Sequence, residues 1–188
     1  MGRGATARAV RHARRVGAEV TPEDGNLAVV ALGANVGDAR RAIELAMAKL
    51  GDLTDQPLRQ SSLWETQPVD CPPGSPAFVN AVVAFQPRLG ETPESLLVKL
   101  QALEKEFGRR PKVVLNEPRP LDLDLIAFGR ETRATAELTL PHPRALLRRF
   151  VLQPLSEVAP DLRLAGQPQT VTALLDQLPP EPGMRKLT

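Results

Sequence analysis

Two aspartates, Asp122 and Asp124, interrupt an apolar run in the stretch LDLDLIAFG, and their spacing suits the binding of hard cations. Successive side chains of a β-strand point to opposite faces, so the two carboxylates share one face while Leu121, Leu123 and Leu125 share the other. The two aspartate Cα atoms then lie about 6.5 Å apart, which lets both carboxylates hold a pair of Mg²⁺ ions. Taken alone, the spacing also fits a half-exposed strand with two solvated aspartates.

A basic, proline-rich loop, GRRPKVVLNEPRP, directly precedes the aspartates and carries Arg109, Arg110, Lys112 and Arg119. Arginines beside magnesium-binding carboxylates suit a polyphosphate, because the cations bridge some phosphate oxygens and the guanidinium groups donate to the others. The alternative is an ordinary solvated basic loop.

The composition excludes other kinds of metal site. A single cysteine, Cys71, cannot form an internal disulfide, and two histidines are too few for a Cys/His zinc site. We therefore expect any metal to be held by carboxylates.

The chain also lacks the phosphate-binding motif G-x-x-x-x-G-K-[ST]. The glycine-bearing turn LGANVGD is too short for a P-loop and has no third glycine for a dinucleotide fingerprint. It is interpreted as a connector in which Asp38 caps the next helix, with a ligand contact of Asn35 as the alternative.

Alternating strand and helix patterns follow from residue 27 onward. Short apolar runs predict strands over 27–33, 57–66, 77–87 and 121–129, and apolar residues at helical spacing predict helices over 38–51 and 91–108. In the second helix Thr92 is the expected N-cap and Pro93 the first helical residue. A proline-bounded turn with a short helix over 138–155 and a last helix over 171–178 follow. The order predicts an α+β fold with a ferredoxin-like βαββαβ core, an antiparallel sheet with helices packed on it.

The basic character of the chain, with a sequence pI of about 9.0, belongs mainly to residues 1–26. This segment has five arginines against three acidic residues, and the rest is formally neutral. With few large apolar residues, it is predicted to be a flexible N-terminal extension, followed by one domain over residues 27–188. An organelle transit peptide or an N-myristoylation signal at MGRGAT are the alternatives.

The length and hydropathy of the chain limit the number of domains and the cellular location. A chain of 188 residues with 42% hydrophobic residues can form one domain with a sizeable core. No apolar run approaches the roughly 18 residues of a membrane span, and the start lacks the apolar centre of a secretory signal. We expect a cytoplasmic protein with no membrane partner.

Five blocks together resemble one family, the 6-hydroxymethyl-7,8-dihydropterin pyrophosphokinases of folate biosynthesis. The blocks are ALGANVGD, SSLWETQPV, FVNAVVAF, LEKEFGRRPKVVLNEPRPLDLDLI and LPHPRALLRRFVLQPLSEVAP, in the family's order between about Leu27 and Pro160. The resemblance implies transfer of pyrophosphate from MgATP to the pterin alcohol, which gives AMP and the pterin diphosphate. It also implies ATP and the pterin as small-molecule substrates. We expect a monomer with no nucleic-acid partner, and docking to another folate enzyme is left open.

The resemblance further assigns roles to residues. Asp122 and Asp124 match the aspartates that bind two Mg²⁺ ions, and Arg109 and Arg119 match arginines that contact the phosphates and support transfer. Phe78 and Phe150 match the aromatics that enclose the pterin, Asn80 matches the asparagine at its edge, and Thr66 and Val69 complete that pocket. The ATP-binding set comprises Glu104, Arg109, Arg119, Thr139, His142 and Arg148.

Residue chemistry supports part of this assignment. Phe78 and Asn80 share one strand face, so one can stack on a ring and the other can address its edge, although a strand phenylalanine is more often core. His142 lies between two prolines, where an exposed turn residue is the alternative. The chain departs from many family members at Trp64, Pro111, Asn116 and Glu117, which puts loop motion and ATP affinity in question.

Two other classes of function were weighed. An RNA-binding module of the same fold would need several stacking aromatics, yet aromatic residues are only 3% and the domain is neutral. An inactive scaffold is disfavoured because both aspartates and the residues that match the pterin pocket are present. No residue is assigned as a general base. Replacement of either aspartate by asparagine is expected to abolish transfer without loss of stability, because it relieves repulsion between like charges.

Overall fold

The computed structural model describes residues 26–68, 71–110 and 118–188. The elements in chain order are β1 (Ala28–Ala34), α1 (Ala39–Gly51), β2 (Arg59–Gln60), β3 (Trp64–Thr66), β4 (Phe78–Phe85), α2 (Pro93–Glu106), β5 (Asp122–Phe128), β6 (Arg133–Ala134), β7 (Thr139–Leu140), the 3₁₀ helix η2 (Ala145–Leu147), α3 (Arg149–Val158), α4 (Val171–Leu175) and β8 (Arg185–Lys186). The predicted N-terminal extension lies almost wholly outside the described residues, so its flexibility stays a prediction.

The main sheet has the strand order β5-β1-β4-β3-β8, with β2 also paired to β4, and every pairing is antiparallel. The elements β1, α1, β3, β4, α2 and β5 follow the βαββαβ order, which confirms the predicted ferredoxin-like α+β fold. A bulge in the pairing of β1 with β5, between Val29 and Val30, lies beyond the aspartates. It therefore leaves the alternation of Asp122 and Asp124 intact.

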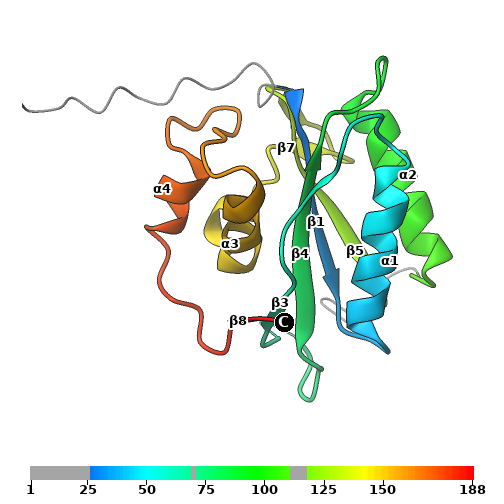
Figure 1. The fold of residues 1–188 in the computed structure, drawn as a ribbon, viewed down its shortest axis with the longest axis vertical. Coiled ribbons are helices and arrows are strands. Elements are labelled where there is room, and N and C mark those ends of the chain that lie inside the picture. The colour runs from blue at the N-terminus through cyan, green and yellow to red at the C-terminus, as the bar shows by residue number, and fades with distance from the viewer. Residues whose placement is uncertain (1–25, 69–70, 111–117) are drawn as a thin grey trace, which may run out of the picture.

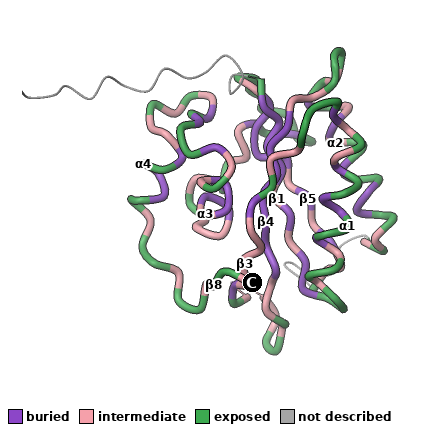
Figure 2. Tube along the Cα trace, viewed as in Figure 1, coloured by how far each residue is buried: buried purple, intermediate pink, exposed green. Residues whose placement is uncertain are grey.

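Helices cover both faces of this sheet (Figure 1), with α1 and α2 on one side and α3 and α4 on the other. Alternate β1 residues enter two separate cores, Val30 and Leu32 towards α1 and α2, and Val29 towards α3 and α4. Because both faces are buried, the central strands are apolar along almost their whole length, which the buried centre of Figure 2 reflects.

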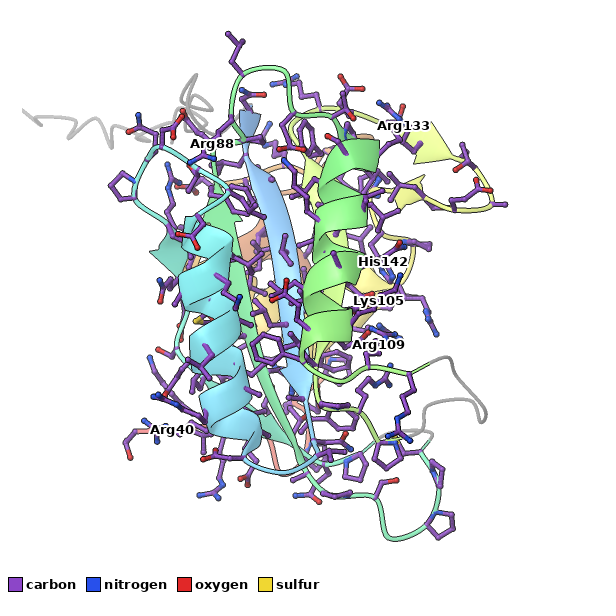
Figure 3. All side chains as sticks on the ribbon, turned by 90° about the vertical axis from the view of Figure 1, so that its right-hand side faces the viewer. Arg40, Arg88, Lys105, Arg109, Arg133 and His142 are labelled. Atoms are coloured by element: carbon purple, nitrogen blue, oxygen red, sulfur yellow. The ribbon has the colours of Figure 1, made fainter. Side chains whose placement is uncertain are left out.

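Local signals fix the ends of the two long helices. Asp38 accepts a hydrogen bond from the backbone N–H of Arg41, and Thr92 caps α2 through a reciprocal capping box with Ser95. Gly108, just after α2, has φ of 87°, a conformation that favours glycine. In Figure 3, α1 and α2 lie side by side over the sheet, and Arg109 follows the end of α2. The helix end therefore positions Arg109.

The structure differs from the sequence-based prediction at the sheet edge. The single strand predicted over 57–66 is two short strands, β2 and β3. Between them the Ser61 N–H still donates to the Val82 carbonyl of β4, but the Ser61 hydroxyl accepts the Val82 N–H in place of a backbone carbonyl. The hairpin of β6 with β7 and the C-terminal strand β8 were not predicted. Among the described residues, no helix is long and apolar enough to cross a membrane.

Candidate active site

The two aspartates lie on the sheet face that packs against α3. Asp122 pairs in register with Gly33 of β1, which in turn pairs with Asn80 of β4, and Asp124 pairs with Ala31. Directly paired residues point to the same face, so Gly33 and Ala31 separate the aspartates from β4. Because Gly33 and Ala31 have no large side chain, space remains above β1 between the carboxylates and the amide of Asn80.

A cleft of about 620 Å³ opens over this part of the sheet. Its walls come from the ends of β1, β3, β4 and β5, from α2, and from the segment of η2 and α3. The predicted site residues among its lining are Thr66, Phe78, Asn80, Glu104, Arg109, Arg119, Asp122, Asp124, Arg148 and Phe150. Residues that are up to 84 positions apart in the sequence thus meet in one cavity.

Asp122 is held by two arginines. Arg119 Nη1 donates to Asp122 Oδ2 at 2.8 Å, and Arg109 Nη1 donates to Asp122 Oδ1 and to Glu104 Oε1. The side chains of the three ion-paired residues at Asp122 are only 16–22% exposed, so the pairs are partly screened from water. Burial lowers the pKa of Arg109, but the charges of Asp122 and Glu104 outweigh it and raise that pKa.

Asp124 has a different environment. It forms no ion pair with a residue in the described ranges. Burial, and then the charge of Asp122, raise its pKa, while His142 and Arg148 act in the opposite direction. Among the described residues, Asp124 is therefore the member of the aspartate pair without a direct ion pair.

His142 and Arg148 lie near Asp124, on the segment that follows β7. The His142 backbone N–H donates to the Ile126 carbonyl of β5 at 2.8 Å, which ties this segment to the strand of the aspartates. Burial lowers the pKa of His142, against the opposing charge of Asp124, and burial together with Arg144 lowers the pKa of Arg148. Both groups lose hydration here and would gain from an anionic ligand.

Glu104 closes the open edge of β5. Its Oε1 accepts the backbone N–H of Leu123 at 2.7 Å, a donor that an edge strand would otherwise leave unpaired. Burial raises the pKa of Glu104 to about 7, although the Leu123 N–H and Arg109 lower it. Glu104 thus connects α2, Arg109 and the strand of the aspartates.

The aromatic side chain of Phe78 and the amide of Asn80 lie on β4, two strands away from Asp122 on β5. Asn80 is buried, and its Nδ2 donates to Thr66 Oγ1 at 2.8 Å, which fixes the amide. Phe78 lies under the Arg119 guanidinium at 5.8 Å, and Phe150 lies under that of Arg148 at 5.4 Å. Each arginine therefore stands between the acidic part and the aromatic part of the cleft.

Asn35 is a structural connector of the site. Its Oδ1 accepts the Arg119 backbone N–H at 2.8 Å, its own N–H donates to the Arg119 carbonyl at 3.1 Å, and its Nδ2 donates to the Pro76 carbonyl at 3.3 Å. Asn35 thus positions Arg119 and the segment that enters β4. The capping role of Asp38 is confirmed, while a ligand contact of Asn35 stays untested.

Comparison with known proteins places this geometry in a family. Residues 29–160 match the profile of 7,8-dihydro-6-hydroxymethylpterin-pyrophosphokinase (HPPK). The chain belongs to the HPPK family. Two relatives named 2-amino-4-hydroxy-6-hydroxymethyldihydropteridine pyrophosphokinase agree: that of Synechocystis is 36% identical over 84% of this chain and 78% of its own length. That of Pseudomonas aeruginosa is 40% identical over 72% of this chain and 82% of its own length.

Other HPPK relatives are much longer than this chain. The folic acid synthesis protein fol1 of Pneumocystis carinii is 40% identical over 74% of this chain, but only 18% of its own length is matched. A solved HPPK-DHPS structure of Plasmodium falciparum with pteroate superposes with a TM-score of 0.63 at 13% identity, over 81% of this chain and 44% of the solved chain. The chain thus spans less than half of these relatives, and this structural likeness supports the fold alone.

Some residues predicted for the HPPK site do not line the cleft, and others lie outside the residues that the structure describes. Thr139 is exposed on β7 and is not part of the lining. His142 is not part of the lining either, although it interacts electrostatically with Asp124. Val69 lies outside the described residues, as do Pro111, Asn116 and Glu117. The roles assigned to these residues stay predictions.

The HPPK cleft also has lining residues that the sequence reasoning missed, among them Gln67, Gln101, Arg144 and Glu181. Arg144 stands in the PHPR block, so its place beside His142 and Arg148 could have marked it. Glu181 stands in a proline-rich segment without periodicity and gave no such signal.

Proposed function

We propose that this chain transfers the terminal pyrophosphoryl group of ATP to 6-hydroxymethyl-7,8-dihydropterin, which yields AMP and the pterin diphosphate for folate synthesis. One observation carries the proposal. An acidic pair flanked by arginines shares a cleft with a phenylalanine and amide pocket two strands away. The strands of the two sites, β5 and β4, are two strand spacings or about 10 Å apart. This separation suits a pterin ring at β4 and the triphosphate of ATP at β5.

The acidic pair fits magnesium by its chemistry. Asp122 and Asp124 offer hard carboxylate oxygens, and Asp124 lacks an ion-pair partner in the described chain. No cluster of three or more His, Cys, Asp or Glu side chains suited to a metal occurs among residues 26–68, 71–110 and 118–188. Mg²⁺ commonly takes one or two carboxylates and completes its shell with water and substrate phosphate. We therefore infer that these two aspartates hold two Mg²⁺ ions, which neutralise the triphosphate when bound.

The arginines are proposed to bind the phosphates. Arg109 and Arg119 reach Asp122 from both sides, so their remaining N–H groups lie next to any phosphate held there. Arg148 and His142, whose pKa values are lowered mainly by burial, stand on the Asp124 side. Thr139 is kept in the proposed ATP-binding set. These groups align the triphosphate and stabilise the charge that develops during transfer.

The pterin is proposed to occupy the aromatic end. Phe78 and Phe150 would stack on its faces, and Asn80, fixed by Thr66, would bond to its edge. The hydroxymethyl oxygen then attacks the β-phosphorus, AMP departs with the bridging oxygen, and the hydroxyl proton is released. A loose transition state needs little early deprotonation of the alcohol, so no general base is assigned.

The partners are small molecules in this proposal. The cleft is lined by residues of one chain, so we propose that both substrates bind there and that the protein acts as a monomer. We also propose a cytoplasmic location without nucleic-acid or membrane partners. The test is nucleotide analysis after incubation with MgATP, with and without the pterin. The proposal requires AMP that forms only with the pterin; formation of ADP, or AMP independent of the pterin, would refute it.

A further inference from the structure

The C-terminal segment contributes an acidic side chain to the cleft. Glu181 lines the cavity together with Thr66, Gln67 and Phe150, although it lies beyond residues 29–160 that match the HPPK profile. No role for it therefore follows from the family assignment.

Contacts on both sides fix the position of this segment. Arg149 Nη1 donates to the carbonyls of Leu178 at 2.8 Å and Pro179 at 3.4 Å. Further along, Arg185 of β8 pairs with Glu65 of β3. The segment between these anchors runs from α4 to β8 (Figure 1), and its Glu181 lines the cleft.

A tight turn sets the direction of Glu181. The Met184 N–H donates to the Glu181 carbonyl at 3.2 Å, and Gly183 in this turn has φ of 77°. A Cβ at Gly183 would lie 3.0 Å from Gln67 Cγ, so the turn packs closely on another lining residue. Glu181 consequently lies at the β3 end of the cleft, where Thr66 and Phe78 also pair.

One carboxylate oxygen of Glu181 is left without a partner. Its Oε1 is buried and has no hydrogen bond with any residue of the described ranges. Burial raises the pKa of this carboxyl, against a hydrogen bond from the Phe150 backbone and the charge of Arg149. A buried acceptor of this kind is costly, and a bound donor would satisfy it.

We propose that Glu181 is a specificity-determining residue of the pterin pocket, whose Oε1 accepts a hydrogen bond from the 2-amino edge of the ring. This inference rests on the proposed function. The 2-amino group and the adjacent ring N–H are donors, whereas a phosphate chain offers only acceptors and would be repelled by the carboxylate. The rival donor is the adenine amino group of ATP, which the experiment separates.

Glu181→Gln is the informative variant. The Phe150 N–H on one side and the ligand N–H on the other are both donors, so an acceptor-only carboxylate serves both. Glutamine must turn its NH₂ group toward one of them. Loss of one charge-assisted hydrogen bond is expected to weaken pterin binding roughly tenfold to a hundredfold.

The experiment measures equilibrium binding of 6-hydroxymethylpterin in the presence of magnesium and a non-hydrolysable ATP analogue. Its probe pair is this pterin and an analogue with the 2-amino group replaced by methyl. In the parent protein the analogue should bind more weakly, and in Glu181→Gln this difference should disappear. ATP affinity should stay within about twofold of the parent value.

Glu65→Gln is the matched control. It removes the ion pair with Arg185 on the same segment, and Glu65 does not line the cleft. This control should retain the parent's preference for the amino ring. Equal weakening in both variants, an unchanged preference in Glu181→Gln, or a loss of ATP affinity instead would each overturn the inference. A parent that binds no pterin and forms no AMP would instead refute the proposed function itself.

Discussion

Asp122→Asn and Asp124→Asn form a matched pair of which only the first should lower the stability of the metal-free protein. The sequence alone predicts relief of repulsion in both variants. In the structure, however, Asp122 holds Arg109 and Arg119, whereas Asp124 has no ion pair in the described part of the chain. Among the described residues, therefore, Asp124→Asn removes a charge without breaking an ion pair, whereas Asp122→Asn weakens two.

The magnitude follows from these contacts. Asparagine at 122 weakens two charge-assisted hydrogen bonds among side chains that are 16–22% exposed, and a loss of about 1.5–3 kcal/mol is expected. For a domain of this size each kcal/mol corresponds to about 2–4 °C in Tm. Asp122→Asn should therefore melt about 3–12 °C lower. Asp124→Asn should melt no lower than the parent, because burial and Asp122 already disfavour its charge.

The assay is thermal unfolding of the two variants and the parent at neutral pH in EDTA. Single-turnover AMP formation across a magnesium titration accompanies it, and both variants should lose about a hundredfold or more in kcat. Equal destabilisation of both variants, or a lower Tm for Asp124→Asn than for Asp122→Asn, would refute the assignment of the ion pairs. Turnover near the parent rate in both would show that the aspartates are structural.

Three further predictions concern other parts of the chain. Phe78→Ala should weaken pterin binding by roughly 1–3 kcal/mol in titration calorimetry with much less effect on ATP, and equal losses for both ligands would mean that Phe78 is core. Burial raises the pKa of Glu104 from 4.5 to about 7, so folding favours the protonated carboxyl. The resulting contribution to stability is fully present below pH 4.5 and is lost as the pH rises through 7. The metal-free parent should thus lose up to about 3 kcal/mol between pH 5 and 8 relative to Glu104→Gln in denaturant titrations, and parallel curves would contradict this. Deletion of residues 1–26 should lower the pI but leave Tm and turnover nearly unchanged, and a clear drop in Tm would show that the segment packs on the domain.

Local patterns predicted the elements that carry the site. The alternation in LDLDL placed both aspartates on one face, and the spacing of Phe78 and Asn80 did the same on β4, because a strand repeats every two residues. Capping residues likewise located the starts of α1 and α2.

Contacts between distant segments could not be predicted in this way. Which arginine pairs with which aspartate depends on the register of β5 and on the end of α2, and no local pattern encodes it. Glu181 is held at the cleft by the contacts of Arg149 with the Leu178 and Pro179 carbonyls and by the pairing of the two-residue strand β8 with β3, and so short a strand has no readable periodicity. Its position was accessible only from the structure.

The central claim is that the cleft directs the pterin alcohol to the β-phosphorus of ATP. The most direct measurement uses ATP that carries a phosphorus label at the β position, followed by separation of the nucleotides from the pterin product. We predict that all transferred label appears in the pterin diphosphate, with unlabelled AMP in equal amount. Label retained in ADP would mean transfer of the γ-phosphoryl group alone, and would contradict the account.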